Sequence, residues 1–155
     1  MAKEQNSVLT INGGGFMDPN YNSNGANPVG LTISNKKIIT DHNMGSASGV
    51  VGFNTDNTLV LLQNVGGEKA LEIGIRDAVS MGPFLIVNGQ KSFTKGNGGW
   101  GYAARTAIGQ RKDGIVLFLV IDSNATRTKG ASMKDLVEIM QRYGAVNAAN
   151  LDGGT

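Results

Sequence analysis

Three short stretches of the sequence combine residue types that bind anions or sugars. They are NGGGF at 12–16, Arg105-Thr106, and DGGT at 152–155. Runs of glycine expose backbone N–H groups that hold an anion, and an arginine guanidinium grips phosphate or carboxylate through paired hydrogen bonds. A carboxylate such as Asp152 can act as a base or nucleophile, or orient a sugar hydroxyl. Together the three stretches suit a phosphorylated or sugar ligand.

Each stretch taken alone also has a structural explanation. A glycine-rich loop is more often a turn than an anion site, and a lone arginine is usually a surface charge. The functional interpretation therefore depends on the combination. The sequence contains no GxxxxGK[ST] pattern, which argues against a P-loop nucleotide hydrolase, and no GxSxG nucleophile elbow.

Three further residues are candidates with two interpretations each. The single histidine, His42, cannot form a histidine-rich metal site, and is either a loop hydrogen-bonding residue or a substrate contact. Trp100 lies among glycines and either stacks on a sugar ring or fills the edge of the core. Asp122 follows the most apolar run of the sequence. It is either a second carboxylate of the site or an ordinary turn residue.

Composition limits the class of protein. The chain has 155 residues, 40% hydrophobic and 17% charged, with a net charge of +2 and no cysteine. Glycine is frequent, at 23 residues, but without a collagen-like period. We therefore expect a loop-rich globular domain without disulfides, without a lysine/arginine run for nucleic acid, and without a membrane segment. We also expect no metal and no cofactor.

Periodicity predicts the elements that position the candidate residues. Alternating apolar residues with turn signals predict hairpins at 28–40, 48–65 and 104–122, short strands at 8–11 and 83–87, and a strand followed by a loop within 145–155. Asn88-Gly89 is typical of a type I′ turn. A capping box, Ser132 with Asp135, opens a helix that ends at Gly144.

The segment 68–81 fits two patterns. Leu71, Ile73 and Ile75 alternate as in a strand, whereas Leu71, Ile75, Ala78 and Val79 share a helical face. We favour a helix, because Gly82 and Pro83 then end it. The chain as a whole is predicted to be α+β, with a mixed, largely antiparallel sheet of about eight strands and two or three helices in a single domain over 1–155.

Six motifs in order resemble one family. They are NGGGF at 12–16, GANPVGLTIS at 25–34, DAVSMGPFLIVNG at 77–89, RTAIG at 105–109 with DGIVLFLVID at 113–122, GASMKDLVEIM at 130–140 and NLDGGT at 150–155. This order resembles the phosphodiester glycosidase domain family over nearly the whole chain. Gly15 departs from the pattern, because the family often has an aromatic residue there. Members also continue past DGG, so we expect this domain to be incomplete at its C-terminus.

The resemblance implies removal of a sugar whose anomeric carbon is bonded to a phosphodiester. Arg105 and the glycine N–H groups would then clamp the growing phosphate charge. Asp152 is the first choice, and Asp122 the second, for the carboxylate that stabilises the anomeric carbon or activates water. The expected catalytic residues are Asp152, Asp122 and Arg105, and the expected substrate-binding residues are Asn12, Gly13, Gly14, Gly15, Phe16, Thr106, Gly153, Gly154, Thr155, His42 and Trp100.

Three hypotheses about function remain open on this basis. The first is a bacterial glycosidase, extracellular or in the cell envelope, that acts on a sugar-1-phosphodiester of an envelope glycan or exopolysaccharide. The second is a non-catalytic module that binds a sugar phosphate or glycan. The third is a structural fragment that self-assembles through exposed sheet edges. We expect a monomer or a weak oligomer.

Overall fold

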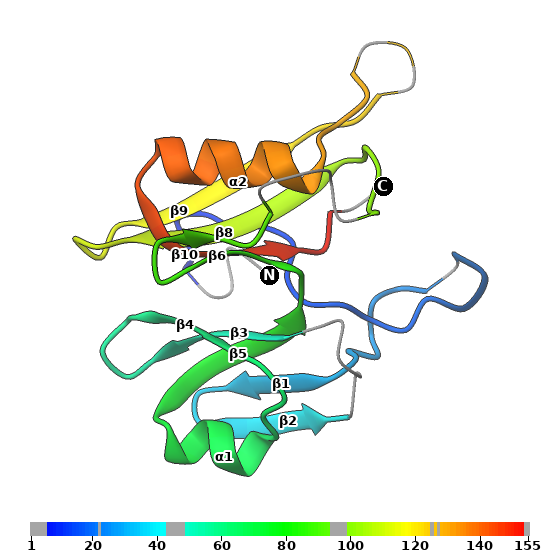
Figure 1. The fold of residues 1–155 in the computed structure, drawn as a ribbon. Helices are drawn as coiled ribbons and strands as arrows, with labels where there is room; N and C mark the ends of the chain where they lie inside the picture. The colour runs from blue at the N-terminus through cyan, green and yellow to red at the C-terminus, as the bar shows by residue number, and fades with distance from the viewer. Residues whose placement is uncertain are drawn as a thin grey trace.

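The computed structural model has four layers, in the order helix, sheet, sheet, helix (Figure 1). It describes residues 6–21, 23–42, 49–93, 99–124, 126 and 128–153. Helix α2 covers the outer face of one five-stranded sheet, and helix α1 covers the outer face of the other (Figure 1). We call the first the upper sheet and the second the lower sheet, as they lie in Figure 1.

The secondary structure of the described residues comprises one short 3₁₀ helix, two α-helices and ten strands. Their bounds are η1 Pro19–Tyr21, β1 Leu31–Ser34, β2 Lys37–Asp41, β3 Gly49–Asn54, β4 Leu59–Leu62, α1 Gly67–Glu72, β5 Ile75–Met81, β6 Phe84–Val87, β7 Gln90–Lys91, β8 Arg105–Arg111, β9 Val116–Ile121, α2 Met133–Arg142 and β10 Ala145–Leu151.

Each sheet has a strand in its centre that comes from a distant part of the chain. The lower sheet has the order β2-β1-β5-β3-β4, and the upper sheet has the order β7-β6-β10-β8-β9. Strand β5 pairs with β3, and β10 pairs with β8 and β6, all in antiparallel register. Strand β10 lies between β6 and β8 and ends at Leu151. Its pairing with these two strands therefore fixes the position of Asp152, the next residue.

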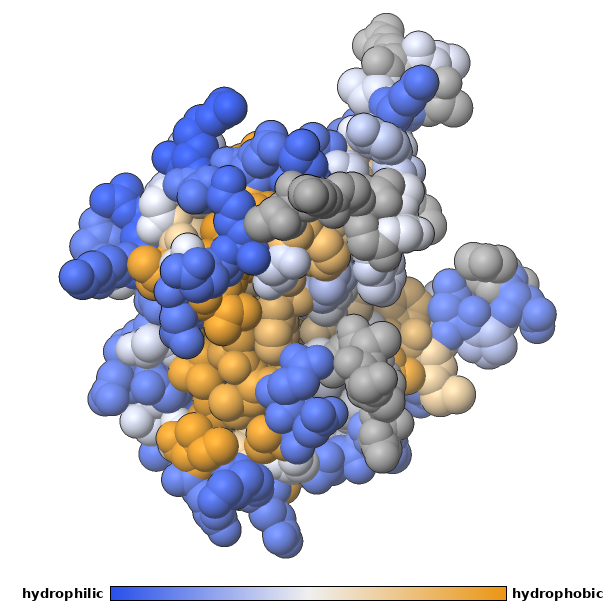
Figure 2. Space-filling view, viewed as in Figure 1, coloured by the Kyte–Doolittle hydropathy of each residue, from blue (hydrophilic) through white to orange (hydrophobic). Residues whose placement is uncertain are grey.

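The hydrophobic residues form three clusters that separate the four layers. One lies between α2 and the upper sheet and includes the fully buried Leu136 and Met133, and a second lies between α1 and the lower sheet. The third lies between the sheets and includes Val51, Ile108 and Leu151. Each such side chain stabilises the fold by about 1.5–3 kcal/mol when fully buried. On the face shown in Figure 2, apolar residues gather where the two sheets meet.

Polar side chains join the two sheets at the turn between β3 and β4. Gln110 of β8 accepts a hydrogen bond from the Leu59 N–H (2.7 Å) and donates one to the Asn57 carbonyl oxygen (2.8 Å). Asn147 of β10 donates to the Leu59 carbonyl oxygen (3.0 Å). These bonds satisfy backbone groups of β4 and align the upper sheet with the lower one.

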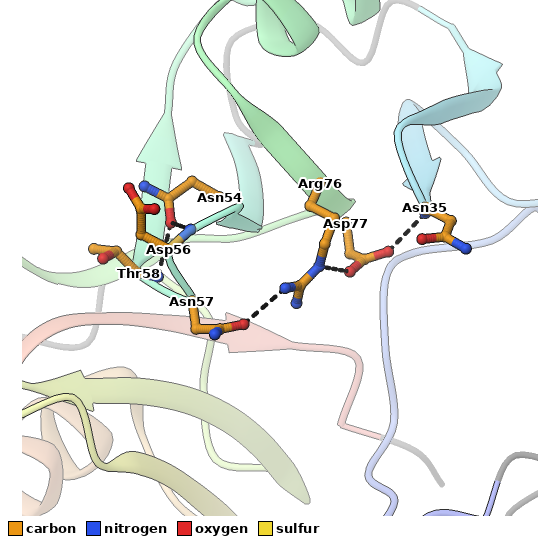
Figure 3. Close-up of polar contacts among 7 residues, drawn as sticks. All are labelled: Asn35, Asn54, Asp56, Asn57, Thr58, Arg76 and Asp77. Carbon is orange, nitrogen blue, oxygen red and sulfur yellow. Dashed lines mark hydrogen bonds and ion pairs between the residues drawn. The ribbon is translucent and has the colours of Figure 1, made fainter.

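Hydrogen bonds within the lower sheet hold the same turn (Figure 3). Arg76 donates from Nη1 to Asn57 Oδ1 (2.7 Å) and from Nε to Asp77 Oδ2 (2.7 Å). Burial by itself raises the pKa of Asp77, but the hydrogen bonds from Arg76 and the Asn35 N–H, with the Arg76 charge, outweigh it and lower the pKa. This group of side chains is internally paired, so its role is to fix the turn.

Most of the predicted elements are confirmed. The three hairpins are present as β1–β2, β3–β4 and β8–β9, and β6 and β7 meet at a turn where Asn88 and Gly89 both have positive φ. The predicted C-terminal helix is α2. Its Ser132 hydroxyl accepts from the Asp135 N–H (3.2 Å) while Asp135 accepts from the Ser132 N–H (2.8 Å).

Three structural predictions need correction. The helix favoured for 68–81 is wrong beyond Glu72, because α1 ends there and 75–81 form β5. Strand β5 pairs with both β1 and β3, which buries Ile75 and Ala78 and outweighs the helical preference of that segment. No strand forms at 8–11, where Val8 is fully exposed and only Ile11 packs on the core between the sheets. The described residues form ten strands, in two sheets, instead of about eight.

The capping box predicts a pH-dependent contribution to stability. The hydrogen bonds from Ser132 lower the pKa of Asp135, so its carboxylate stabilises the fold above the unfolded pKa of about 3.9. We expect Asp135→Ala to lower the free energy of unfolding by about 1 kcal/mol at neutral pH. Urea denaturation of the wild type and of Asp135→Ala should show that the difference in the free energy of unfolding shrinks as the pH falls through the lowered pKa of Asp135. A difference that does not change with pH would contradict the charge-dependent cap.

Candidate functional site

The three stretches singled out by their chemistry meet at one end of the upper sheet. The Asp152 N–H donates to the Gly13 carbonyl oxygen (3.0 Å), which joins the end of β10 to the glycine loop. Gly153 lies against the backbone of Ala104, so closely that a Cβ at Gly153 would overlap with the Ala104 carbonyl. The loop at 12–16, the start of β8 and the end of β10 are therefore neighbours, although 140 residues of sequence separate the first from the last.

The glycine loop bridges the two sheets. The Gly15 N–H donates to the Ser80 carbonyl oxygen of β5 (3.1 Å), and Gly15 in turn accepts from the Val29 N–H (3.0 Å). A Cβ on Gly14 would lie 2.8 Å from Val79 Cβ, which leaves no room for a side chain. Of the three glycine N–H groups in the loop, that of Gly15 is engaged, whereas those of Gly13 and Gly14 have no acceptor among the described residues.

Arg105 is a buried cation whose hydrogen bonds go to neutral groups. Its side chain is 8% exposed, and its Nε donates to the Ala131 carbonyl oxygen (3.1 Å). Its Nη2 donates to the carbonyl oxygens of Trp100 (2.8 Å) and Gly101 (3.1 Å). Within the described part of the chain no carboxylate lies within 4.0 Å, and burial lowers the pKa of the guanidinium. A buried charge without a counter-ion is costly, and an anionic ligand would offset that cost.

The register of β8 and β10 sorts the site residues by face. Ala107 lies opposite Asn150, and Thr106 lies opposite Leu151. Since side chains alternate along a strand, Arg105 and Asp152 extend the Ala107–Asn150 row on the face that α2 covers. Thr106 lies on the other face, between the sheets, where it is 2% exposed.

The other candidate residues surround this end of the sheet or lie outside the described residues. Asn12 is exposed at the start of the glycine loop, and Phe16 is half-buried in a bridge to Pro28. Trp100 is 45% exposed beside the loop that Arg105 holds. Gly154 and Thr155 are outside the described residues.

Asp122 and His42 are both exposed. Asp122 directly follows β9 and accepts a hydrogen bond from the Ser123 N–H at its own Oδ1 (2.8 Å). His42 follows β2 in the lower sheet, where its backbone N–H donates to the Gly30 carbonyl oxygen (3.2 Å). The structure thus brings Arg105, Asp152 and the glycine loop together, and places Asp122 on the adjacent strand end and His42 on the other sheet.

One residue of the site was not singled out from the sequence. Asn150 is 2% exposed, and its Nδ2 donates to the Gly82 carbonyl oxygen (2.9 Å). Its Oδ1 is buried with no partner in the part of the chain that is described. The available signal was an amide side chain within the apolar run Ala148-Ala149-Asn150-Leu151, since buried polar side chains need a reason to be there.

The described residues contain no group of three or more histidine, cysteine, aspartate or glutamate side chains that could hold a metal ion. None of the helices found among them is long and apolar enough to cross a membrane. The chemistry available at this end of the sheet is therefore that of a cation, backbone N–H groups, a carboxylate and an amide.

Comparison with known proteins agrees with the geometry. The family model of the phosphodiester glycosidases matches residues 5–155. This chain belongs to the phosphodiester glycosidase family. One relative is the SPbeta prophage-derived uncharacterized protein YomE of Bacillus subtilis (strain 168). It is 30% identical to this chain over 162 residues, and the alignment covers 99% of this chain and 24% of that protein.

Two solved structures share the fold of this chain. One is the catalytic domain of zebrafish N-acetylglucosamine-1-phosphodiester α-N-acetylglucosaminidase, auto-inhibited by its pro-peptide, with a TM-score of 0.72 and 23% identity. The alignment covers 92% of this chain and 50% of that one. The other is a hypothetical protein from Synechocystis, with a TM-score of 0.65 and 16% identity over 99% of this chain and 47% of that one. The chain thus spans about half the length of these structures.

Two adjacent glycines of the loop give a test of its packing. We expect Gly14→Ala to lower the free energy of unfolding by about 1–3 kcal/mol, because its Cβ would overlap with Val79 and the Ser80 carbonyl. Gly13→Ala is the matched control, since nothing lies within 4 Å of its Cβ position. Equal losses for the two variants in urea denaturation would contradict the described packing of the loop.

The buried cation gives a test of anion binding. Inorganic phosphate should raise the melting temperature of the wild-type chain, because a ligand that binds only the folded state stabilises it. The rise should disappear in Arg105→Met and remain in Arg111→Met, whose exposed guanidinium pairs with Asp113 (2.6 Å). A phosphate-dependent rise of equal size in all three proteins would show that Arg105 is not the anion site.

Proposed function

We propose that this domain hydrolyses the bond between the anomeric carbon of a sugar and the phosphate of a phosphodiester. The observation that carries the proposal is the buried Arg105, which has no carboxylate partner in the described structure and extends the same row of side chains as Asp152. Membership of the phosphodiester glycosidase family supports the reaction class. The N-acetylglucosamine-1-phosphodiester named for the zebrafish enzyme is the first substrate to test.

In the proposed reaction, the bond between the anomeric carbon and the phosphate oxygen breaks, and water supplies the new oxygen. The leaving group is a phosphomonoester, whose negative charge grows as the bond lengthens. Arg105 and the Gly13 and Gly14 N–H groups stabilise that charge in the transition state more than in the bound substrate, which is the condition for catalysis. A phosphate is already a good leaving group, so protonation by a general acid matters less.

The carboxylate of Asp152 acts on the other side of the breaking bond. It stabilises the positive charge that develops at the anomeric carbon, or removes the proton from the attacking water. Its backbone is fixed by the bond from its N–H to Gly13 and by the contact of Gly153 with Ala104, so the carboxylate and the anion site keep a constant spacing. Asp122 is the second choice for the same role.

The remaining site residues recognise the sugar in this proposal. Trp100 is partly exposed beside the loop held by Arg105, so its ring is available to stack on a sugar face. Asn12 is exposed and can hydrogen-bond to a hydroxyl or a phosphate oxygen. We place the natural substrate among envelope glycans or exopolysaccharides, outside the cytoplasm, as the first hypothesis from the sequence does.

The proposal is tested with an α-linked N-acetylglucosamine-1-phosphodiester that carries a chromogenic aglycone. We expect the wild type to release the aglycone phosphate, from which an added phosphomonoesterase frees the chromogenic aglycone. Asp152→Asn should be slower by at least about 100-fold, the size typical of a lost catalytic carboxylate. Asp56→Asn, at the β3–β4 turn in the lower sheet, is the matched control and should keep the wild-type rate. Asp122→Asn decides between the two carboxylates.

One result would overturn the assigned carboxylates, and another would overturn hydrolysis as the function. Full activity in both Asp152→Asn and Asp122→Asn would show that neither residue is the catalytic carboxylate. A wild type that binds the phosphodiester in calorimetry but releases no product, over a panel of sugars, would replace hydrolysis with recognition of a sugar phosphate.

A further inference from the structure

Strand β9 is an edge strand without the usual protection. Edge strands present unpaired N–H and C=O groups, and proteins guard them by shortness, charge, proline or bulges. Strand β7 has two residues, β4 has four, and β2 carries Lys37 and Asp41 at its ends with an irregular register against β1. By contrast, β9 is VLFLVI, six apolar residues in regular register with β8.

The two faces of β9 have different surroundings. Leu117, Leu119 and Ile121 pack against the core beneath α2. On the opposite face, Val116, Phe118 and Val120 are 37%, 43% and 64% exposed. We call these three residues the β9 stripe. Exposing three neighbouring apolar side chains to water on an open edge is unfavourable, so burying them would stabilise the chain.

The β9 stripe is continuous with an apolar groove between the sheets. Phe118 lies opposite Ile108 in the register of β8 and β9, and Ile108 lines a groove of about 350 Å³ together with Leu151, Phe53 and Val79. The exposed apolar surface therefore extends from the edge of the upper sheet to the space between the sheets, which makes it larger than a single strand.

We propose that two copies of this chain pair through β9 to form one continuous antiparallel upper sheet. A two-fold axis at Phe118 places Phe118 opposite its own copy, Val116 opposite Val120, and Leu117 opposite Leu119. Every paired position is then apolar on both faces, and β-branched and aromatic side chains are favourable cross-strand partners. The strand is thus self-complementary, as a two-fold interface requires.

The charges at the two ends of β9 agree with this arrangement. Lys112 and Asp113 lie in the turn that precedes β9, next to Arg111 at the end of β8, so this end carries a net charge of +1, and Asp122 directly follows β9. Antiparallel pairing brings the turn end of one copy beside the Asp122 end of the other. Opposite net charges then meet at each end of the paired strands, whereas a parallel arrangement would set like charges together.

The first test is the mass of the wild-type chain in solution against concentration, by sedimentation equilibrium. We expect the mass of two chains as a plateau. Phe118→Lys should shift it to one chain, because a lysine opposite its own copy repels it. Ile39→Lys, a substitution at a residue of β2 that is more exposed (58%) than Phe118 (43%), is the control and should stay dimeric. A wild type that remains a monomer up to about 100 µM, or a mass that grows without a plateau, overturns the proposal.

The second test reads the register directly, because the chain contains no cysteine. Directly opposed residues of an antiparallel pair have Cα atoms about 4.5–5.5 Å apart, within the range of a disulfide. Phe118→Cys should therefore form a disulfide-linked dimer on oxidation. Val116→Cys alone and Val120→Cys alone should not, since each lies about 13 Å from its own copy. An equimolar mixture of the last two should cross-link, and cross-linking of Ile39→Cys to the same extent would show random collision instead.

Discussion

The candidate site depends on backbone segments that approach each other more closely than side chains allow. Gly153 touches the carbonyl of Ala104, and Gly14 lies against Val79 of the other sheet. A Cβ at either position would push the end of β10 away from the start of β8, or the glycine loop away from β5. The hydrogen bond from Asp152 to Gly13 forms only because these approaches are possible. Two missing methyl groups thus set the spacing between the carboxylate and the anion site.

That spacing matters because Arg105 is already immobilised. Its three hydrogen bonds to the carbonyl oxygens of Ala131, Trp100 and Gly101 hold the guanidinium in place without neutralising it. The fold therefore keeps a positive charge in a partly dehydrated place, where its interaction with an anion is stronger than in water. The same bonds connect the loop that carries Trp100 to the start of β8, so the position of this loop depends on the Arg105 side chain.

The four-layer arrangement packs both faces of the upper sheet. Helix α2 and its capping box cover one face of the upper sheet, and the lower sheet with Gln110 and Asn147 bonded to its β3–β4 turn covers the other. The glycine loop closes the end by bonding to both sheets. Among the described residues, the β9 stripe with its groove is an exposed apolar surface at the β9 edge of the upper sheet.

The sequence by itself determined the local elements and the chemistry of the site. The hairpins, the Asn88-Gly89 turn and the capped helix follow from short-range patterns, because turn residues and alternation act over a few residues. The motifs NGGGF, RTAIG and NLDGGT identified Arg105, Asp152 and the glycine loop as partners, and the family followed from their order.

Only the tertiary structure decided what depends on distant pairing. Whether 75–81 forms a strand depended on β1 and β3, which lie earlier in the chain, and local propensity favoured a helix. The division into two sheets, the use of the Gly15 N–H by Ser80 and the unpartnered Oδ1 of Asn150 likewise follow from contacts between segments far apart in sequence. A residue type states which bonds a group can make, but the neighbours that burial brings to it decide which bonds it does make.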